Sequence, residues 1–189
     1  MSRRRDLLCI TCTTDISEMP YNEIWYTNGS TTAATQPYEP THFNTNIVSN
    51  TYDAEKECWV IKFNGDVTYI GQYALGDNNF TSITMPNSVV TIETLGIAYC
   101  SSLTSVTIPD SVTTIGFGAF FNCISLTSVY CLATTPPALD GTYVFDNNGS
   151  GRKIYVPYQS LDAYKTATNW SEYAADIVGY DFENDVVVG

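Results

Sequence analysis

Basic residues are scarce in this chain of 189 amino acids, and this scarcity limits what the protein can bind. The chain has eight Lys and Arg against twenty Asp and Glu, a net charge of -12. Three of the eight are Arg3, Arg4 and Arg5, so the rest of the chain has five basic residues against twenty acidic ones, a charge of -15. Such a chain repels phosphate backbones and anionic membrane surfaces. We therefore expect no nucleic-acid partner for the body of the protein.

Histidine is also nearly absent, which weighs against several kinds of catalysis. His42 is the only one, so neither a Ser-His-Asp nor a Cys-His arrangement can be supported. The Gly-Phe-Gly at 116–118 lacks the third glycine of a dinucleotide-binding loop. Asp181, Glu183 and Asp185 lie in an acidic tail, where solvated charge is expected. The sequence predicts no catalytic residue, no enzyme activity and no cofactor.

The chain lacks any apolar run long enough to cross a membrane, so no membrane insertion is expected. The basic start is followed by the short apolar run 7–10, which Asp6 interrupts, and this pattern does not favour a cleaved signal peptide. Cys9 and Cys12 form a single CxxC without a second pair, and we expect no metal there.

Charged residues make up only 15% of the chain, while 44% are hydrophobic and 13% aromatic. This composition indicates a folded, β-rich protein.

What is present is an internal repeat of 22 to 23 residues. When the copies of the repeat are aligned, six positions are apolar in every copy. Such apolar columns predict a stack of similar coils. The columns are Phe80, Leu103 and Leu126; Ile83, Val106 and Val129; Met85, Ile108 and Cys131; Val67, Val89 and Val112; Ile70, Ile92 and Ile115; and Leu75, Ile97 and Phe120.

The spacing of Leu103, Val106 and Ile108 is L-x-x-L-x-L, which is typical of a leucine-rich-repeat solenoid. Alternation directs Val106 and Ile108 inward and leaves Thr107 outward, as in a strand, which Pro109 then ends. The predicted fold is a β-rich α/β repeat, a right-handed leucine-rich-repeat solenoid of stacked parallel strands. Five rungs are expected, headed by Ile61, Ile83, Val106, Val129 and Ile154.

Both ends of a solenoid expose apolar surface and need a cap. Upstream, 46–52 and 58–63 predict an antiparallel hairpin, and the Asn-Gly in EIWYTNGS predicts a second one. Downstream, SLDAYKTATNW and SEYAADIVGY have helical spacing and predict two short helices. The expected organisation is an N-terminal basic and apolar segment at 1–20, a hairpin cap leading into the first rung at 21–66, the solenoid at 67–157, and a helical cap with an acidic tail at 158–189.

The repeat SSLTSVTIPDSVTTIGFGAFFNC and the tail KIYVPYQSLDAYKTATNWSEYAADIVGY resemble the BspA-type leucine-rich repeats of surface proteins from gut and oral bacteria. IWYTNGS and NIVSNTYD resemble the N-terminal cap of that group, so the resemblance covers residues 20–180. It implies a recognition module on the cell surface or outside the cell, with a protein or glycan ligand. The alternative is a virion or other assembly component, such as a bacteriophage appendage, that docks through residues 1–20.

Two further features have more than one interpretation. Cys100 and Cys123 share a column, so neighbouring coils bring their Cα atoms to about 5 Å, within the range for a disulfide. The resemblance instead implies small buried thiols that cap loop backbone, and stacked side chains point alike, so free thiols are the preferred interpretation. DNNGSG at 146–151 imitates half of a calcium loop, but Pro157 stands where the bidentate Glu belongs. A plain polar turn without a metal is expected.

The remaining candidate for function is the outward face of the predicted sheet. Side chains between the buried strand positions form one stripe across five rungs, with a parallel row of Ser82, Ser105, Ser128 and Lys153. A rigid stripe of hydroxyl side chains that ends in two tyrosines suits ligand recognition. The alternative is that Thr and Ser only solvate an ordinary sheet face. The predicted ligand-binding stripe is Lys62, Thr84, Thr107, Tyr130 and Tyr155.

Overall fold

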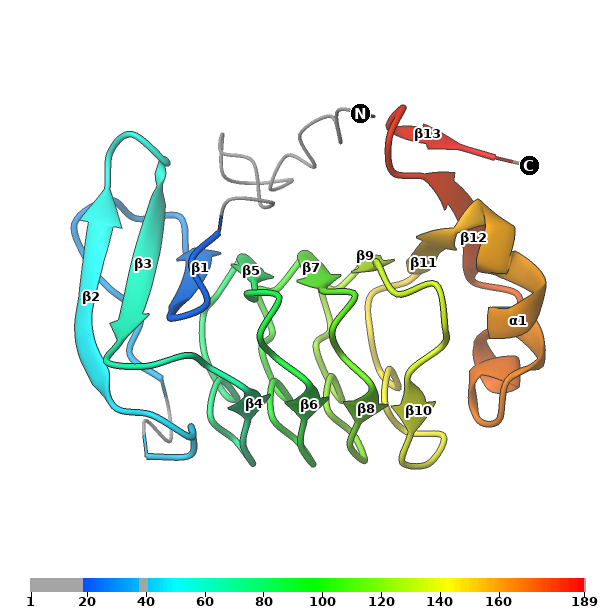
Figure 1. Ribbon diagram of the computed structural model, residues 1–189, viewed down its shortest axis with the longest axis horizontal. Coiled ribbons are helices and arrows are strands. Elements are labelled where there is room, and N and C mark those ends of the chain that lie inside the picture. The colour runs from blue at the N-terminus through cyan, green and yellow to red at the C-terminus, as the bar shows by residue number, and fades with distance from the viewer. Residues whose placement is uncertain (1–18, 38–40, 189) are drawn as a thin grey trace.

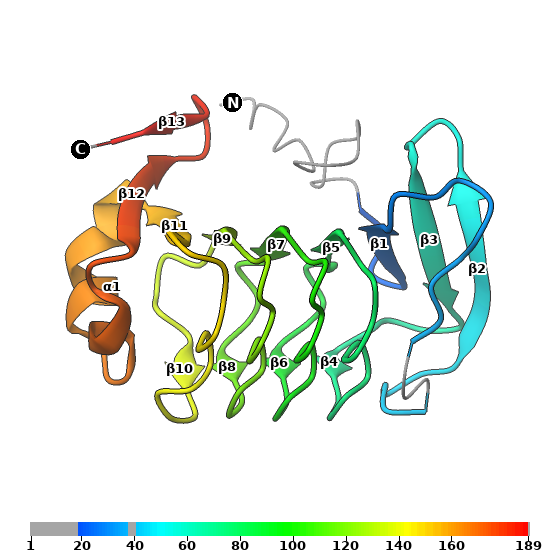
Figure 2. The same ribbon diagram turned by 180° about the vertical axis from the view of Figure 1, so that it is seen from behind.

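Two sheets run side by side along the molecule and are joined by the turns of the coils (Figure 1). The structure is a computed structural model that describes residues 19–37 and 41–188. Figure 2 shows the same two rows of strands from behind. The strands are β1 (Glu23–Thr27), β2 (Ile47–Asp53), β3 (Cys58–Phe63), β4 (Tyr69–Ile70), β5 (Ser82–Thr84), β6 (Thr91–Ile92), β7 (Ser105–Ile108), β8 (Thr114–Ile115), β9 (Ser128–Cys131), β10 (Ala138–Leu139), β11 (Lys153–Pro157), β12 (Ile177–Asp181) and β13 (Val186–Val187).

The long sheet has the order β13-β12-β11-β9-β7-β5-β1-β3-β2, and the short sheet has the order β10-β8-β6-β4. From β5 to β12 the neighbours in the long sheet are parallel, and all neighbours in the short sheet are parallel. Each coil thus contributes one strand to each sheet. The chain forms a β-rich repeat fold.

The predicted apolar columns lie side by side across the coils. Val106 pairs with Ile83 on one side and Val129 on the other, and Ile92 pairs with Ile70 and Ile115. The members of these columns are buried in one continuous core. Because each buried aliphatic side chain contributes about 1.5–3 kcal/mol, stacking several coils offsets the cost of ordering them.

The turns between the two strands of a coil repeat in backbone conformation as well. Asp77, Tyr99, Asn122 and Asn147 stand at corresponding positions of successive coils and all have φ between 51° and 64°. Asn and Asp tolerate this left-handed region through local hydrogen bonds, whereas Tyr does so at a cost. The choice of residue at this position therefore follows backbone conformation rather than burial.

The N-terminal end corrects two expectations. β1 lies between β3 and β5 and is antiparallel to both, with Tyr26 opposite Trp59 and Ile83. Ile61 on β3 therefore does not stack on Ile83, and the first predicted rung is not part of the coil stack. The expected hairpin of β2 and β3 is present. The second expected hairpin, at the Asn28-Gly29 turn, is not, because β1 pairs with distant strands instead.

The C-terminal end corrects a third expectation. α1 (Leu161–Thr166) forms where the first helix was predicted, preceded by the 3-10 turn η2 (Tyr158–Ser160). The second predicted helix is wrong: the 3-10 turn η3 (Trp170–Tyr173) is followed by β12, which pairs in parallel with β11, Ile177 beside Ile154. Burial of alternate residues in 177–181 outweighs the helical spacing, and β12 extends the sheet by one further strand.

The cysteines of the coils are the buried thiols that were preferred to a disulfide. Cys100 and Cys123 are free. The Cys100 Sγ lies 3.1 Å from the carbonyl oxygen of Leu75, and the Cys123 Sγ lies 3.2 Å from that of Ile97. Each thiol therefore ties its coil to the preceding one.

The interpretations of residues 1–18, including Cys9, Cys12 and the signal-like start, concern a segment outside the described residues.

Candidate functional site

The outward row of the coil strands forms as predicted for four of its five members. Thr84, Thr107, Tyr130 and Tyr155 are successive neighbours across β5, β7, β9 and β11. The second predicted row aligns in the same way, with Ser82 beside Ser105, Ser128 beside Ser105, and Lys153 beside Ser128. A rigid parallel ladder therefore sets the positions of both rows.

Lys62 does not belong to this row. It lies on β3, opposite Glu23 of β1, and its Nζ is 3.6 Å from a Glu23 carboxylate oxygen. The residue of β1 that stands beside Thr84 is Trp25, and Trp25 faces Val60 on β3. Counting back one repeat from Thr84 could not reveal the intervening strand. The row continues into Trp25 and Val60, both of which are buried.

The row divides into a covered half and an accessible half. Thr84 and Thr107 are only 3% and 7% exposed. Tyr130 and Tyr155 are half-buried. The two threonines therefore offer little surface to a ligand, and the accessible part of the predicted stripe is its tyrosine end.

At that end the tyrosines belong to an aromatic cluster, here the four residues Tyr130, Tyr155, Tyr180 and Phe182. The rings of Tyr130 and Tyr155 stack with centroids 4.8 Å apart and an interplanar angle of 16°. Tyr180 packs edge-on against both, at 6.0 Å and 5.3 Å, and Phe182 lies 5.0 Å from Tyr180. Offset and edge-to-face pairs of this kind contribute about 0.5–1.5 kcal/mol each beyond the area they bury.

Burial raises the pKa of two tyrosines in this cluster. Desolvation, followed by the neighbouring Tyr155, raises the pKa of Tyr130 above its ordinary value. Desolvation and then the hydrogen bond that the Tyr180 hydroxyl donates to Asp185 raise the pKa of Tyr180. Both phenols are therefore neutral hydrogen-bonding groups near pH 7. Together the cluster offers apolar ring area with hydroxyl tips on a fixed backbone.

Tyr180 and Phe182 were missed by sequence reasoning because their segment has helical spacing. The signal that could have found them is the alternation in 177–181, where Ile177 and Gly179 are buried and Val178 and Tyr180 are half-buried. Such alternation is typical of a strand with one buried face.

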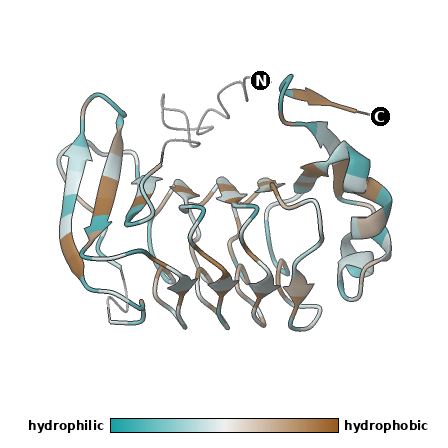
Figure 3. Cartoon of the chain, viewed as in Figure 1, coloured by the Kyte–Doolittle hydropathy of each residue, from teal (hydrophilic) through white to brown (hydrophobic). Residues whose placement is uncertain are grey.

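β12 and β13 lie beyond the end of the row formed by β5, β7 and β9, opposite β2 and β3 at the other end (Figure 1). Figure 3 shows β13 as hydrophobic, and both of its valines are exposed.

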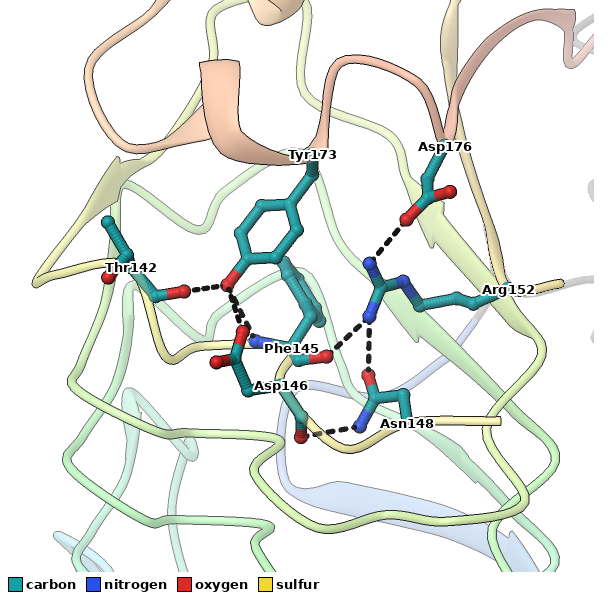
Figure 4. A network of polar contacts seen from close by, with 7 residues as sticks. All are labelled: Thr142, Phe145, Asp146, Asn148, Arg152, Tyr173 and Asp176. Carbon is teal, nitrogen blue, oxygen red and sulfur yellow. Dashed lines mark hydrogen bonds and ion pairs between the residues drawn. The ribbon is translucent and has the colours of Figure 1, made fainter. Parts of the chain in front are cut away.

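The loop that imitates half of a calcium site is filled by an arginine (Figure 4). Arg152 donates to the carbonyl oxygen of Phe145, to Asn148 Oδ1 at 3.3 Å, and to Asp176 Oδ2 at 2.6 Å. Its guanidinium also lies 5.1 Å from the centroid of the Tyr173 ring. A cation bound at Asn148 would meet this guanidinium, which disfavours a metal in the loop. Arg152 joins the last coil to the segment before β12.

Other chemistry finds little support in the part of the chain that the structure describes. Within residues 19–37 and 41–188, no three His, Cys, Asp or Glu side chains are grouped so that they could hold a metal ion. His42 is exposed and its Nδ1 lies 2.5 Å from the carbonyl oxygen of Gln72. Among the described helices, none is both long and apolar enough to span a bilayer.

The repeat geometry agrees with a comparison to protein families. A family model for BspA-type leucine-rich repeats matches residues 45–165 in six copies. The chain belongs to the BspA-type leucine-rich-repeat family. A search of curated proteins finds no match to the chain. BspA-type repeats generally serve as modules that interact with proteins or other ligands, and the proteins that carry them are typically exposed at the cell surface.

Proposed function

We propose that this protein is a non-enzymatic recognition module that binds a macromolecule at the cell surface or outside the cell. The single observation that supports this most directly is the aromatic cluster, which presents ring area and hydroxyl groups at the accessible end of a rigid sheet. Tyrosine provides contact area at a low cost in side-chain entropy, and this favours it at protein-binding surfaces. Because the rings of the cluster already cover each other's faces, a protein is a better ligand for it than a sugar.

A second candidate function is that of a structural component of a virion or another assembly. The basic residues Arg3, Arg4 and Arg5 and the short apolar run 7–10 favour this alternative, in which residues 1–20 dock the repeat fold onto a larger body. The mass of the protein isolated from its natural source separates the two. Removal of the N-terminal segment supports export, whereas a mass that begins at Met1 or Ser2 supports a particle or the cytosol.

We further infer that the solenoid is right-handed and that its end segments act as caps. Connections between parallel strands of one sheet are right-handed in about 98% of cases, and the coils from β5 to β7 and from β7 to β9 are connections of this type. The β2-β3 hairpin and α1 stand at opposite ends of the coils (Figure 2). In these places they cover the last apolar residues of the core, as solenoid ends require.

Surface plasmon resonance against purified extracellular-matrix and serum proteins tests the binding role. Tyr130→Ala and Tyr155→Ala are expected to weaken binding by about tenfold each, the loss from removing a ring at an interface centre. Each also removes ring packing within the cluster, so we expect a melting temperature lower by several degrees in a protein that remains folded. Tyr21→Ala is the matched control, because Tyr21 is 55% exposed and lies just before β1, outside the aromatic cluster. If the wild type and both cluster variants bind the same purified protein with equal affinity, the cluster is not the binding site.

A further inference from the structure

The short sheet has an outer face of its own, on the opposite side of the coils from the aromatic cluster. A shallow groove lies over β6, β8 and β10 and is bordered by Gln72, which follows β4. Figure 1 shows these strands side by side in the short sheet. The aliphatic side chains of Ile92 and Leu139 at this groove are buried. The polar side chains that line it are Gln72, Thr91, Glu93, Thr94, Thr114 and Asp140. Its accessible functional groups are therefore hydroxyls, an amide and carboxylates.

The repeat sets the spacing of these groups. Thr91 and Thr114 are direct neighbours in the ladder, and one step beyond the paired residues Ile70, Ile92, Ile115 and Leu139 come Gly71, Glu93, Gly116 and Asp140. Since neighbouring strands lie about 4.8 Å apart, the two carboxylate positions, two coils apart, are separated by roughly 10 Å. The groove therefore holds two carboxylates at a separation that the repeat fixes.

Gly116 forms bare backbone between the two carboxylates. A methyl group added there would lie 2.4 Å from the Thr94 backbone nitrogen and 2.6 Å from the Glu93 carbonyl carbon. Such distances are far inside van der Waals contact, so only glycine fits. Gly116 therefore lets the backbones of two neighbouring coils approach closely between the two carboxylates.

The charge of the groove restricts the ligand. No Lys or Arg occurs between Lys62 and Arg152 in the sequence. Within the described residues, the ion pairs involve Asp53, Glu23 and Asp176, so neither Glu93 nor Asp140 is in one. Both carboxylates are exposed. An anionic ligand, such as a sulfated or uronic-acid glycan, would be repelled from this surface.

Two aromatic rings lie next to each other just beyond the residues that line the groove. Phe117 and Tyr143 are 44% and 50% exposed, and their ring centroids are 5.3 Å apart with an interplanar angle of 50°. Gly141 gives the Phe117 ring its place, because a methyl group at Gly141 would stand 3.2 Å from Phe117 Cδ2. Phe117 directly follows Gly116 in the sequence, and Gly141 directly follows Asp140. The Phe117 ring therefore lies beside Gly141, one residue beyond the groove lining, and both rings are open to solvent.

We propose that this groove binds a neutral oligosaccharide. The C–H face of a sugar ring packs against an exposed aromatic ring, while sugar hydroxyl groups donate to carboxylates and exchange hydrogen bonds with hydroxyls and amides. Glu93, Asp140, Thr114 and Gln72 provide these groups in the groove, and Phe117 with Tyr143 provides the ring surface. A cationic peptide fits the charge but has no exposed aliphatic pocket to enter, because Ile92 and Leu139 are buried.

Isothermal titration calorimetry of the full chain with maltohexaose, cellohexaose and mannohexaose tests the site, with hexagalacturonic acid as the anionic comparison. At least one neutral hexasaccharide is expected to bind, with little dependence on salt, and the anionic one is not. Phe117→Ala and Tyr143→Ala should each weaken that binding by about tenfold, the loss of one ring contact. Thr114→Val, which removes one hydroxyl from the groove, should weaken it by a smaller factor.

Ile124→Ala is the matched control, since Ile124 is exposed to a similar extent but does not line the groove. Its affinity should equal that of the wild type, as should that of Tyr155→Ala, which separates this site from the aromatic cluster. Absence of heat with all three neutral sugars overturns the proposal. So does binding that survives Phe117→Ala unchanged, or binding of a Lys-Leu repeat peptide where the neutral sugars do not bind.

Discussion

The repeat coils at 67–157 and the two ends of the chain are stabilised in different ways. In the coils a side chain packs against the residue at the same position of the next coil, as Val106 does against Ile83 and Val129. At the N-terminal end the contacts are individual: the Tyr26 hydroxyl lies 3.0 Å from Asn50 Oδ1, and Trp59 Nε1 donates to the Ser30 carbonyl at 2.7 Å. The coils thus depend on regular backbone spacing, whereas the ends depend on specific pairs of side chains.

The largest effect is expected where a substitution disturbs the spacing of the coils. Gly116→Ala places a methyl group against the backbone of the preceding coil, and we expect a loss of about 3 kcal/mol in the free energy of unfolding. Gly65→Ala is the control at the N-terminal end, because its methyl group would meet only the Thr45 side chain, with Oγ1 at 3.2 Å and Cβ at 3.9 Å. Urea unfolding measures both. A Gly116→Ala protein as stable as Gly65→Ala would contradict close stacking of the coils.

The next largest effect concerns the connection between the coils and the C-terminal end. Arg152→Leu removes the guanidinium that bonds Asn148 and Asp176, and leaves the half-buried Asp176 carboxylate and the carbonyl of the buried Phe145 without this donor. We expect a loss of about 2 kcal/mol, since hydrogen bonds to charged groups contribute about 1.5–3 kcal/mol. Lys62→Leu is the matched control, because Lys62 is exposed and its ion pair is longer. Equal stability of the two variants would show that the Figure 4 network does not hold the C-terminal segment in place.

A smaller effect is expected at Tyr173, within the same network. Burial raises the pKa of Tyr173 to about 12 from an ordinary value near 10. The folded state therefore holds its proton more tightly than the unfolded state, so this contribution is complete below pH 10 and is lost as the pH rises through 12. Tyr173→Phe should lower the free energy of unfolding near pH 8 by about 1 kcal/mol, because the hydrogen bonds of the Tyr173 hydroxyl are lost.

Tyr173→Phe should also make the decline in stability between pH 10 and 12 shallower. Denaturant titrations at several pH values compare the two proteins. Parallel profiles for the wild type and the variant would mean that Tyr173 ionises no differently in the folded and unfolded states. Tyr21→Phe provides the exposed control.

The smallest effect is expected from reduction. Cys100 and Cys123 are free and each lies against a backbone carbonyl of the preceding coil. Dithiothreitol should therefore leave their state unchanged, and peptide mapping after alkylation of the unfolded, unreduced protein should find both thiols labelled. A peptide in which the two cysteines are joined would contradict this account of the column.

The coils were predictable because their physics is local and repeated. The same apolar positions, the strand-ending proline and the buried cysteine recur every 22 to 23 residues, so each copy supports the interpretation of the next. The position of β1 was not predictable, because no periodicity marks a strand that enters between β3 and β5. The same intervening strand removed Lys62 from the predicted row.

The candidate site was predictable to the same extent. Tyr130 and Tyr155 followed from register alone. The burial of Thr84 and Thr107 did not, because covering of a sheet face depends on tertiary packing and leaves no trace in the repeat. Tyr180 was missed because the spacing in SEYAADIVGY satisfies a helix and a strand alike, and pairing with β11 decides between them.

Backbone NOEs in the labelled protein test the stacking of the coils most directly. We predict contacts between α and amide protons that join the strand of Ile83 to that of Val106, and the strand of Val106 to that of Val129, together with contacts between Tyr26 and Ile83 across the antiparallel pair. A direct backbone contact between Ile61 and Ile83, or none between the strands of Val106 and Val129, would contradict the account.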